Sequence, residues 1–584
     1  MRGTKHEVRG TKHEARGYRY EVCSSNIEYR ISNIEYRISN IEYRISNIEY
    51  RTSNFEPRIQ GVIYLSSNNK VAARLMLQGT SSSVGKSVLS AAFCRIFYQE
   101  GYLVSPFKAQ NMALNSFVTA TGGEMGRAQV VQAQAAGIEP EVRMNPVLLK
   151  PSGSTGSQVV IMGRSQGNVT ALRYHGEYQR MTWPFVKDAL HGLLDEFEIV
   201  IIEGAGSPAE VNLKSNDIVN MRVALEANSP VLLVADIDRG GALASVVGTL
   251  ELVETKEREM VKGIIFNKFR GELALLQPAL DFIEERTGIP VLGVVPYFKI
   301  RLPDEDSVAL NEAMEKPSVA SAEQLDIAVI RFPYISNFTD FDALQDEVDV
   351  SVRYVTELTN LGKPDLIILP GSKNTLGDLR FLHKSGLGTQ IQKLCEQEIP
   401  LIGICGGYQM MGRSVKDPLH SESELEDMNG LDILPMVTEF FPQKHTVRSK
   451  GKILSQHGFF SACTGETIEG YEIHMGRSTP DEGQSPLFHL TSNGVSYTDG
   501  LQAGKAYGTY LHGIFDNDGL RTALLVWLWQ RRGRVRPVEA SLSQAALRES
   551  AFNELADLVR QSVDIERVRT IMGLDSDTVP KRIR

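Results

Sequence analysis

The chain has 584 residues, a formal net charge of −9 and a mean hydropathy of −0.17, which describe a soluble protein too long for one core. The net charge argues against a nucleic-acid-binding protein. No apolar run is long enough for a membrane span or a secretory signal, so we expect a cytoplasmic protein without a membrane partner. Five scattered cysteines form neither a disulfide framework nor paired zinc ligands.

Residues 1–70 differ in kind from the rest of the chain. Residues 2–17 repeat RGTKHEV and residues 25–51 repeat SNIEYRI, both with a period of seven. The isoleucines alternate spacings of four and three, as in a coiled coil, but strong helix formers and capping residues are missing. We expect a low-complexity, disordered tail without a catalytic role, and a coiled coil is the alternative.

The first folded domain is predicted over residues 72–303 and opens with a glycine-rich loop, "QGTSSSVGKS". This loop has one residue more between its glycines than the common phosphate-binding loop. A strand-like run precedes it and a helical pattern follows, so backbone N–H groups would face a phosphate. Lys86 would reach terminal phosphates, and the Ser87 hydroxyl would bind Mg²⁺. The predicted ATP contacts here are Gly79, Thr80, Gly85, Lys86 and Ser87, and an ordinary Gly/Ser turn is the alternative.

The stretch "PFKAQNMALNS" supplies four polar side chains in a short space. They are Lys108, Gln110, Asn111 and Asn115. Such density predicts contacts with a substrate carboxylate or phosphate, and a polar surface loop is the alternative.

Four later apolar runs end in polar loops: "EIVIIEG", "SPVLLVADIDRGG", "VKGIIFNKF" and "IPVLGVVPYF". Such runs, separated by helical stretches, predict a doubly wound α/β domain whose ligands collect at the carboxyl ends of parallel strands. Glu203 ends the first run, where it would bind the Mg²⁺ of a nucleotide, unless it is a solvated acid. Asn267 and Lys268 belong to the third, where the amide would read an adenine edge unless the pair forms a simple turn.

A linker, a second doubly wound domain and a helical C-terminal segment are predicted over residues 304–323, 324–518 and 519–584. The second domain again alternates apolar strands with glycine turns. The C-terminal segment carries no motif.

The second domain contains a candidate nucleophile. In "IPLIGICGGYQMM", Cys405 lies between a strand and a helical run, where a sharp turn would expose its thiol to helix N–H groups. His512, in "AYGTYLHGIFD", ends another strand and would be its base. Gly371 and Gly406 would supply N–H groups to an oxyanion hole. The role of His474, in "YEIHMG", stays open between a site residue and a structural one.

These motifs resemble known families. The cysteine turn with His512 resembles class I glutamine amidotransferases, and the long loop resembles that of dethiobiotin synthetase. A chain with both is similar to the cobalamin-pathway amidotransferases. The resemblance runs from about residue 75 to 518 on "QGTSSSVGKS", "FKAQNMALNS", "GGEMGRAQ", "EGAGSPAEVNL", "DIDRGGA", "ISNFTDFDAL", "LPGSKNT" and "GYEIHMGRS".

The resemblance implies a glutamine-hydrolysing, ATP-dependent carbon–nitrogen ligase. ATP with Mg²⁺ would phosphorylate the b, d, e and g carboxylates of a corrinoid, adenosylcobyrinic acid a,c-diamide, and ammonia from L-glutamine would displace the phosphate. Cys405 and His512 would form the glutaminase pair. Association into a homo-oligomer is compatible with the sequence.

One position departs from the class I pattern. A glutamate usually stands two residues after the histidine, but Ile514 is found here, so the residue that orients His512 stays open and the glutaminase would be slower or differently tuned. Two other functions stay open. One is amidation of the a and c carboxylates by the sister enzyme. The other is a nucleotide switch with a glutamine-sensing domain, in which Cys405 would be dispensable.

Overall fold

The computed structural model describes residues 72–151, 156–170, 174, 179–302, 321–537 and 543–574. The predicted tail and nearly all of the predicted linker lie outside the described residues. Within these ranges, no helix is both long and apolar enough to cross a membrane.

The first domain is built on a parallel sheet with the strand order β12-β11-β10-β1-β9-β2. The prediction of buried parallel strands is confirmed, because the four apolar runs form β9, β10, β11 and β12. The strands are β1 (Ala73–Gly79), β2 (Val104–Phe107), β9 (Ile199–Glu203), β10 (Val231–Asp236), β11 (Val261–Phe269) and β12 (Val291–Pro296).

Helices cover both faces of this sheet, as a doubly wound fold requires. Successive residues of β1 divide between two cores: Leu75 and Leu77 pack with Phe93, whereas Met76 packs on the opposite face with Val200. The helices are α2 (Lys86–Gln99), α3 (Arg127–Ala135), α5 (Gln179–Glu196), α6 (Met221–Ala227), α7 (Ala242–Leu252), α8 (Thr255–Arg258) and α9 (Leu273–Thr287).

Two small sheets lie beside this core. One has the order β3-β6-β7-β8, and the other is a single antiparallel pair, β4 with β5. Their bounds are β3 (Gln110–Met112), β4 (Ser116–Val118), β5 (Glu124–Gly126), β6 (Val147–Pro151), β7 (Gly156–Ile161) and β8 (Arg164–Thr170). Of these strands, β4 follows the polar stretch around residue 110 and contacts strands of the second domain.

The second domain begins as a parallel sheet in the order β15-β13-β16-β18-β25. Its strands are β13 (Leu325–Ile330), β15 (Val350–Val355), β16 (Leu366–Leu369), β18 (Leu401–Ile404) and β25 (Ala506–Thr509). The helices are α11 (Asp342–Gln345), α12 (Thr375–Ser385), α13 (Leu387–Glu396), α14 (Gly406–Met410) and α15 (Asp518–Arg531). A short antiparallel pair, β14 (Ile335–Ser336) with β17 (Gly371–Ser372), lies apart from the sheet.

Antiparallel strands extend this sheet beyond β25, which the sequence analysis did not predict. They are β21 (Met436–Ile453), β22 (Thr467–Pro480), β23 (Pro486–Ser492) and β24 (Val495–Ala503), with the small strands β19 (Ser414–Lys416) and β20 (Asp427–Asn429) at the edge. These strands mix buried with exposed residues along their length, so they lack the long apolar runs that marked the parallel strands.

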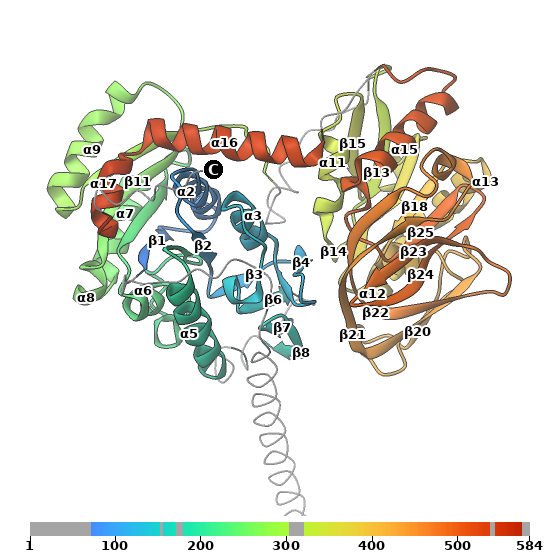
Figure 1. Cartoon of the computed structure of the whole chain (residues 1–584), viewed down its shortest axis with the longest axis horizontal. Helices are drawn as coiled ribbons and strands as arrows, with labels where there is room; N and C mark the ends of the chain where they lie inside the picture. The colour runs from blue at the N-terminus through green and yellow to red at the C-terminus, as the bar shows by residue number, and fades with distance from the viewer. Residues whose placement is uncertain are drawn as a thin grey trace, which may run out of the picture. The chain divides into compact units, whose positions relative to one another are not determined.

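The C-terminal helices divide between the two domains. In α15, Leu524 and Trp529 pack in the core of the second domain. The helices α16 (Gln544–Ser562) and α17 (Ile565–Met572) instead complete the core of the first domain, where Phe552 packs and α16 lies against α2 (Figure 1). The predicted separate segment 519–584 is therefore shared between both cores.

Candidate active sites

Cys405 occupies a strained turn between β18 and α14. Its backbone has φ 51° and ψ −107°, a conformation that a non-glycine residue adopts only when its surroundings impose it. The chain passes very close to its neighbours here, because a Cβ on Gly407 would lie 2.0 Å from the Leu369 carbonyl oxygen. The turn holds the thiol at the start of a helix, as a nucleophile requires.

His512 follows β25 and is oriented by Asp340. Its Nδ1 lies 2.7 Å from Asp340 Oδ2, and the other carboxylate oxygen accepts the N–H of Gly513 at 3.1 Å. Asp340 lies in a short 3₁₀ turn, Phe338–Phe341, inside the stretch "ISNFTDFDAL". The residue that orients His512, which the sequence left open, is therefore Asp340, and it comes from a different part of the chain than the acid in the class I pattern.

The electrostatics of this pair favour a charged imidazole. Burial alone would lower the pKa of His512, but the charge and hydrogen bond of Asp340, together with Cys405, raise it to about 10. An imidazolium beside the sulfur can neutralise an attacking thiolate and donate a proton to departing ammonia.

Both glycines predicted for the oxyanion hole lie near this pair. A Cβ on Gly371 would come within 3.1 Å of Cε1 of His512, and one on Gly406 would come within 2.8 Å of the Ser372 N. Gly406 therefore leaves no room for a Cβ, and the contact at Gly371 is tight. Their predicted role as N–H donors to an oxyanion stays a prediction.

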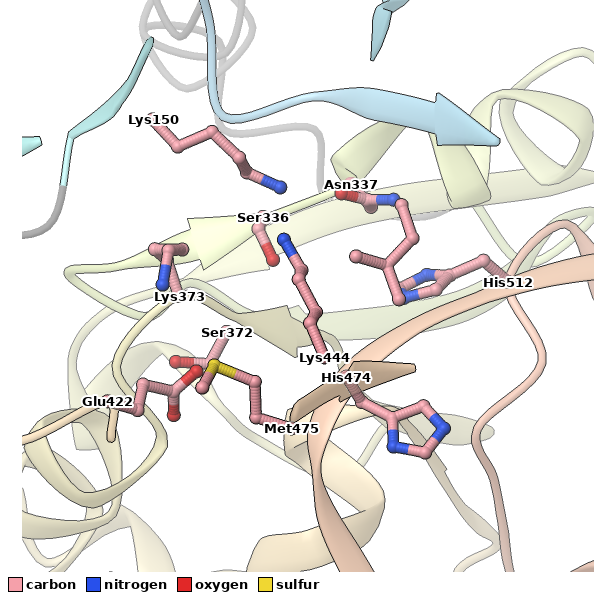
Figure 2. Close-up of a pocket in the computed structure, with 11 residues that line it drawn as sticks. Lys150, Ser336, Asn337, Ser372, Lys373, Glu422, Lys444, His474, Met475 and His512 are labelled. Atoms are coloured by element: carbon pink, nitrogen blue, oxygen red, sulfur yellow. The ribbon is translucent and has the colours of Figure 1, made fainter. Parts of the chain in front are cut away.

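A pocket opens beside His512 and is lined by residues of both folded domains (Figure 2). His474 lines it too, and its ring stacks on Tyr510 with the centroids 3.8 Å apart. The sulfur of Cys405 lies 3.6 Å from the carbonyl oxygen of Ile473. The lining residues are Lys150, Ser336, Asn337, Ser372, Lys373, Glu422, Lys444, Ile473, His474, Met475 and His512.

An ion cluster joins the domains at this pocket. Glu124 is almost fully buried and binds Lys150 of the first domain at 2.8 Å and Lys444 of the second at 2.6 Å. Burial alone would raise the pKa of Glu124, but the two lysines hold it well below its usual range. Burial lowers the pKa of Lys444 to about 8. The carboxylate and the two ammonium groups therefore stabilise one another at this junction.

Replacing Glu124 with glutamine should destabilise this junction. Two buried ammonium groups would lose their carboxylate, so we expect the free energy of unfolding to fall by about 3–5 kcal/mol, measured by denaturant titration. The control is Glu139→Gln, which breaks a mostly exposed pair with Arg448 across the same domains and should change the free energy by less than about 1 kcal/mol. Equal effects of both variants would contradict this role of Glu124.

The predicted nucleotide loop connects β1 to α2. Gly85 caps α2 with φ +100°, and a Cβ there would clash with the Asn267 amide at 2.0 Å. Lys86 Nζ donates to the carbonyl oxygens of Ser81 and Gly206, each at 3.1 Å. The Thr80 N–H donates to the Val234 carbonyl oxygen of β10 at 2.9 Å, so it belongs to the sheet and does not point into the loop. The remaining loop keeps the strand–loop–helix geometry of a phosphate site.

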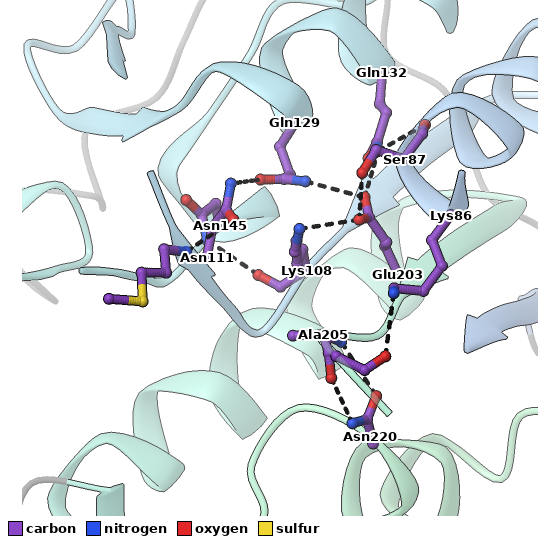
Figure 3. A network of polar contacts seen from close by, with 12 residues as sticks. Lys86, Ser87, Lys108, Asn111, Gln129, Gln132, Asn145, Glu203, Ala205 and Asn220 are labelled. Carbon is purple, nitrogen blue, oxygen red and sulfur yellow. Dashed lines mark hydrogen bonds and ion pairs between the residues drawn. The ribbon is translucent and has the colours of Figure 1, made fainter. Parts of the chain in front are cut away.

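Glu203 is the centre of a polar network beside this loop (Figure 3). Ser87 donates to its Oε1 at 2.7 Å and Lys108 to the same oxygen at 2.9 Å, whereas Gln132 donates to Oε2 at 2.6 Å and Gln129 at 3.3 Å. The carboxylate is buried at the end of β9. Adjacent hydroxyl and carboxylate oxygens are the ligands that Mg²⁺ prefers, so the residues present fit this ion.

Asn267 and Lys268 brace the loop from β11. The Asn267 amide donates to the Val84 carbonyl at 2.8 Å, and Lys268 Nζ donates to that of Ser83 at 2.6 Å. Within the described part of the chain, Oδ1 of Asn267 is buried without a hydrogen-bond partner. Its donor is committed to the loop, and adenine recognition stays a prediction.

The polar stretch around residue 110 is distributed over different contacts. Lys108 donates to Glu203, and Asn111 donates to Gln129 at 3.1 Å and accepts the Met112 N–H at 2.8 Å. Gln110 accepts the hydroxyl of Tyr174, and Asn115 accepts the N–H of Phe338 in the second domain at 3.0 Å. Lys108 is thus brought directly to the predicted metal ligand Glu203, and Asn111 is linked to it through Gln129.

Several functional residues escaped the sequence analysis. Asp340 and Glu124 stood inside quoted motifs, "ISNFTDFDAL" and "GGEMGRAQ", but nothing in their spacing pointed to His512 or to the lysines. Gln129 and Gln132 share one face of α3, where their spacing of three was an available signal.

Known proteins resemble this chain over both domains. The model for the CobQ/CobB/MinD/ParA nucleotide-binding domain matches residues 75–307, and that for the CobB/CobQ-like glutamine amidotransferase domain matches residues 326–520. Three relatives are named cobyric acid synthase. The protein of Desulfitobacterium hafniense (strain DSM 10664 / DCB-2) is 66% identical over 87% of this chain and 99% of its own. That of Moorella thermoacetica is 54% identical over 87% and 99%, and that of Yersinia enterocolitica is 50% identical over 85% and 98%.

With its two sites, this combination of domains defines an ATP-dependent amidoligase that takes nitrogen from glutamine. The chain belongs to the cobyric acid synthase family, which acts in cobalamin biosynthesis. The family supports the amidotransferase interpretation over the nucleotide switch.

Proposed function

We propose that the protein converts adenosylcobyrinic acid a,c-diamide to adenosylcobyric acid by amidating its b, d, e and g carboxylates. The observation that carries the proposal is the similarity to cobyric acid synthases along nearly their whole length, with both candidate sites intact. ATP and glutamine are cytoplasmic metabolites, so the reaction would take place there.

At the ligase site, the first domain would bind ATP on the loop that ends at Ser87. Ser87 and Glu203 would hold Mg²⁺, which when bound offsets the charge of the phosphates. The ammonium groups of Lys86 and Lys108 would also offset the negative charge of the phosphates. A substrate carboxylate would attack the terminal phosphorus and release ADP, and ammonia would then attack the acyl carbon and release phosphate.

At the glutaminase site, the Cys405 sulfur would attack the side-chain carbonyl carbon of glutamine. His512 would donate a proton to the departing nitrogen, so that ammonia leaves and a thioester remains. Water, deprotonated by His512, would then release glutamate and free Cys405. N–H groups near Gly371 and Gly406 would bind the oxyanion in both steps.

The test is to incubate the protein with adenosylcobyrinic acid a,c-diamide, ATP and Mg²⁺, and to follow the corrinoid mass with glutamine or ammonia as nitrogen source. We expect four successive amidations with either source. A Cys405→Ala variant should lose the glutamine-dependent reaction and keep the ammonia-dependent one. Cys395→Ala is the matched control, because that thiol lies half-buried in α13 away from the site.

No mass change with either nitrogen source would refute the proposal. Cobyrinic acid is included as a second substrate, and its amidation in place of the a,c-diamide would assign the chain to the sister reaction.

A further inference from the structure

We propose that His445, Glu472 and His474 form a binding site for a divalent transition-metal ion, of which Zn²⁺ is the best match. The three residues lie on the paired strands β21 and β22, and His445 stands directly opposite His474 in the register. Glu472 and His474 are two residues apart on β22, so they face the same side of the sheet. One ligand atom from each residue falls within 4.8 Å of the others.

The spacing of the ligand atoms matches a metal site. Oε2 of Glu472 lies 3.4 Å from Nε2 of His474 and 3.7 Å from Nε2 of His445. Ligands of a tetrahedral ion at zinc–nitrogen and zinc–oxygen distances of about 2.0–2.2 Å lie roughly 3.3–3.6 Å apart. Both carboxylate–imidazole distances therefore fit one shared ion, and the two imidazole nitrogens lie within 4.8 Å of each other.

The hydrogen bonds outside the cluster point the lone pairs inward. His474 Nδ1 lies 2.7 Å from the Gly476 carbonyl, which can only accept, so Nδ1 carries the proton and the Nε2 of a neutral ring is an acceptor. This acceptor faces another acceptor, Oε2 of Glu472. A metal ion between them would bind both lone pairs, and a backbone carbonyl that fixes the tautomer is the usual support of a metal-binding histidine.

The carboxylate is held in the same way. Oε1 of Glu472 accepts the hydroxyl groups of Ser449, at 3.1 Å, and Tyr497, which leaves Oε2 directed at the two rings. Glu472 is buried, whereas about half of the His445 side chain is exposed. A dissolved ion could thus reach the site from the His445 side. Two imidazoles with one carboxylate and an open position suit zinc and related ions.

A proton on His474 would satisfy the same geometry, so the test must detect a metal. We would titrate the chelator-treated full chain with Co²⁺, whose visible absorption is strong only in four-coordinate sites with protein ligands. The expected result is saturable absorption that Zn²⁺ abolishes by competition. His445→Ala should weaken Co²⁺ binding more than about tenfold. His489→Ala removes another exposed strand histidine and should leave binding unchanged.

Glu472→Gln provides a second variant, accepted only if its thermal unfolding remains cooperative. Absorption that is absent in the full chain, or equal in the full chain and in His445→Ala, would overturn the proposal, and the second outcome would assign the ion to other histidines. The assay measures binding alone, so its result is independent of the amidation reaction.

Discussion

Replacing Asp340 with asparagine is expected to lower the glutaminase kcat by about 10³- to 10⁴-fold. The asparagine amide would face Nδ1 of His512 with an N–H group, which forces the ring into the tautomer that cannot take a proton from Cys405. Amidation driven by ammonia should be unchanged, because the ATP site is not altered. Glutamate release and corrinoid mass, measured in parallel, separate the two activities.

The pH dependence tests whether Asp340 acts through His512. Removal of the carboxylate lowers the pKa of His512 from about 10, so the loss of glutaminase activity at high pH should begin at a lower pH in the variant. The raised pKa of His512 also stabilises the folded protein. This contribution is fully present below about pH 6.5, the pKa of histidine in the unfolded chain, and is lost as the pH rises toward 10.

The control for this residue is Asp346→Asn, which changes a nearby carboxylate paired with Arg301 on the surface. We expect wild-type glutaminase activity from it. An active Asp340→Asn enzyme, or one that loses ammonia-driven amidation to the same extent, would contradict the positioning role.

The second large effect is expected at Glu203. Its replacement by glutamine should reduce amidation by about 10²- to 10³-fold with either nitrogen source, since the site would lose the charge that holds Mg²⁺. Glutaminase activity measured without corrinoid should remain. The Mg²⁺ concentration for half-maximal rate should rise, and Glu203→Asp should recover part of the rate.

A purely structural role for Glu203 predicts a different pattern. Buried Lys108 would lose its ion pair with Glu203, so stability would fall while the Mg²⁺ requirement stayed the same. Glu198→Gln is the matched control, because Glu198 precedes the opposite end of β9 and binds the Leu103 N–H at 2.8 Å. That variant should keep both the rate and the Mg²⁺ dependence.

What the sequence could predict was local. The turn at Cys405 and the loop ending at Ser87 could be predicted because each is a continuous stretch of sequence. In both, an apolar strand, a turn of small residues and the start of a helix follow one another directly. The parallel strands were found for the same reason. The second-domain strands β21–β24 were missed because half-exposed antiparallel strands resemble ordinary polar sequence.

The partners of these local motifs could not be predicted in this way. Asp340 precedes His512 by 172 positions, and Glu124 precedes Lys444 by 320, so only the folded chain brings them together. His512 does follow a strand, as predicted, but the class I pattern has the acid two residues after the histidine. Any carboxylate that the fold places beside Nδ1 can orient the ring, and here it is Asp340, from a different loop.

The return of α16 and α17 to the first domain has a consequence for synthesis on the ribosome. The backbone around Gly293 in β12 pairs with Val563, and a Cβ on Gly293 would lie 2.1 Å from the Ser562 carbonyl oxygen, so the two segments fit closely. Apolar side chains of α2 meet Phe552 and Leu555, which are translated only after the whole second domain. The nucleotide-binding half therefore emerges first but keeps an uncovered apolar face until the last helices leave the exit tunnel. A premature stop would leave the ATP-binding half incomplete even though every residue of its nucleotide loop had been made.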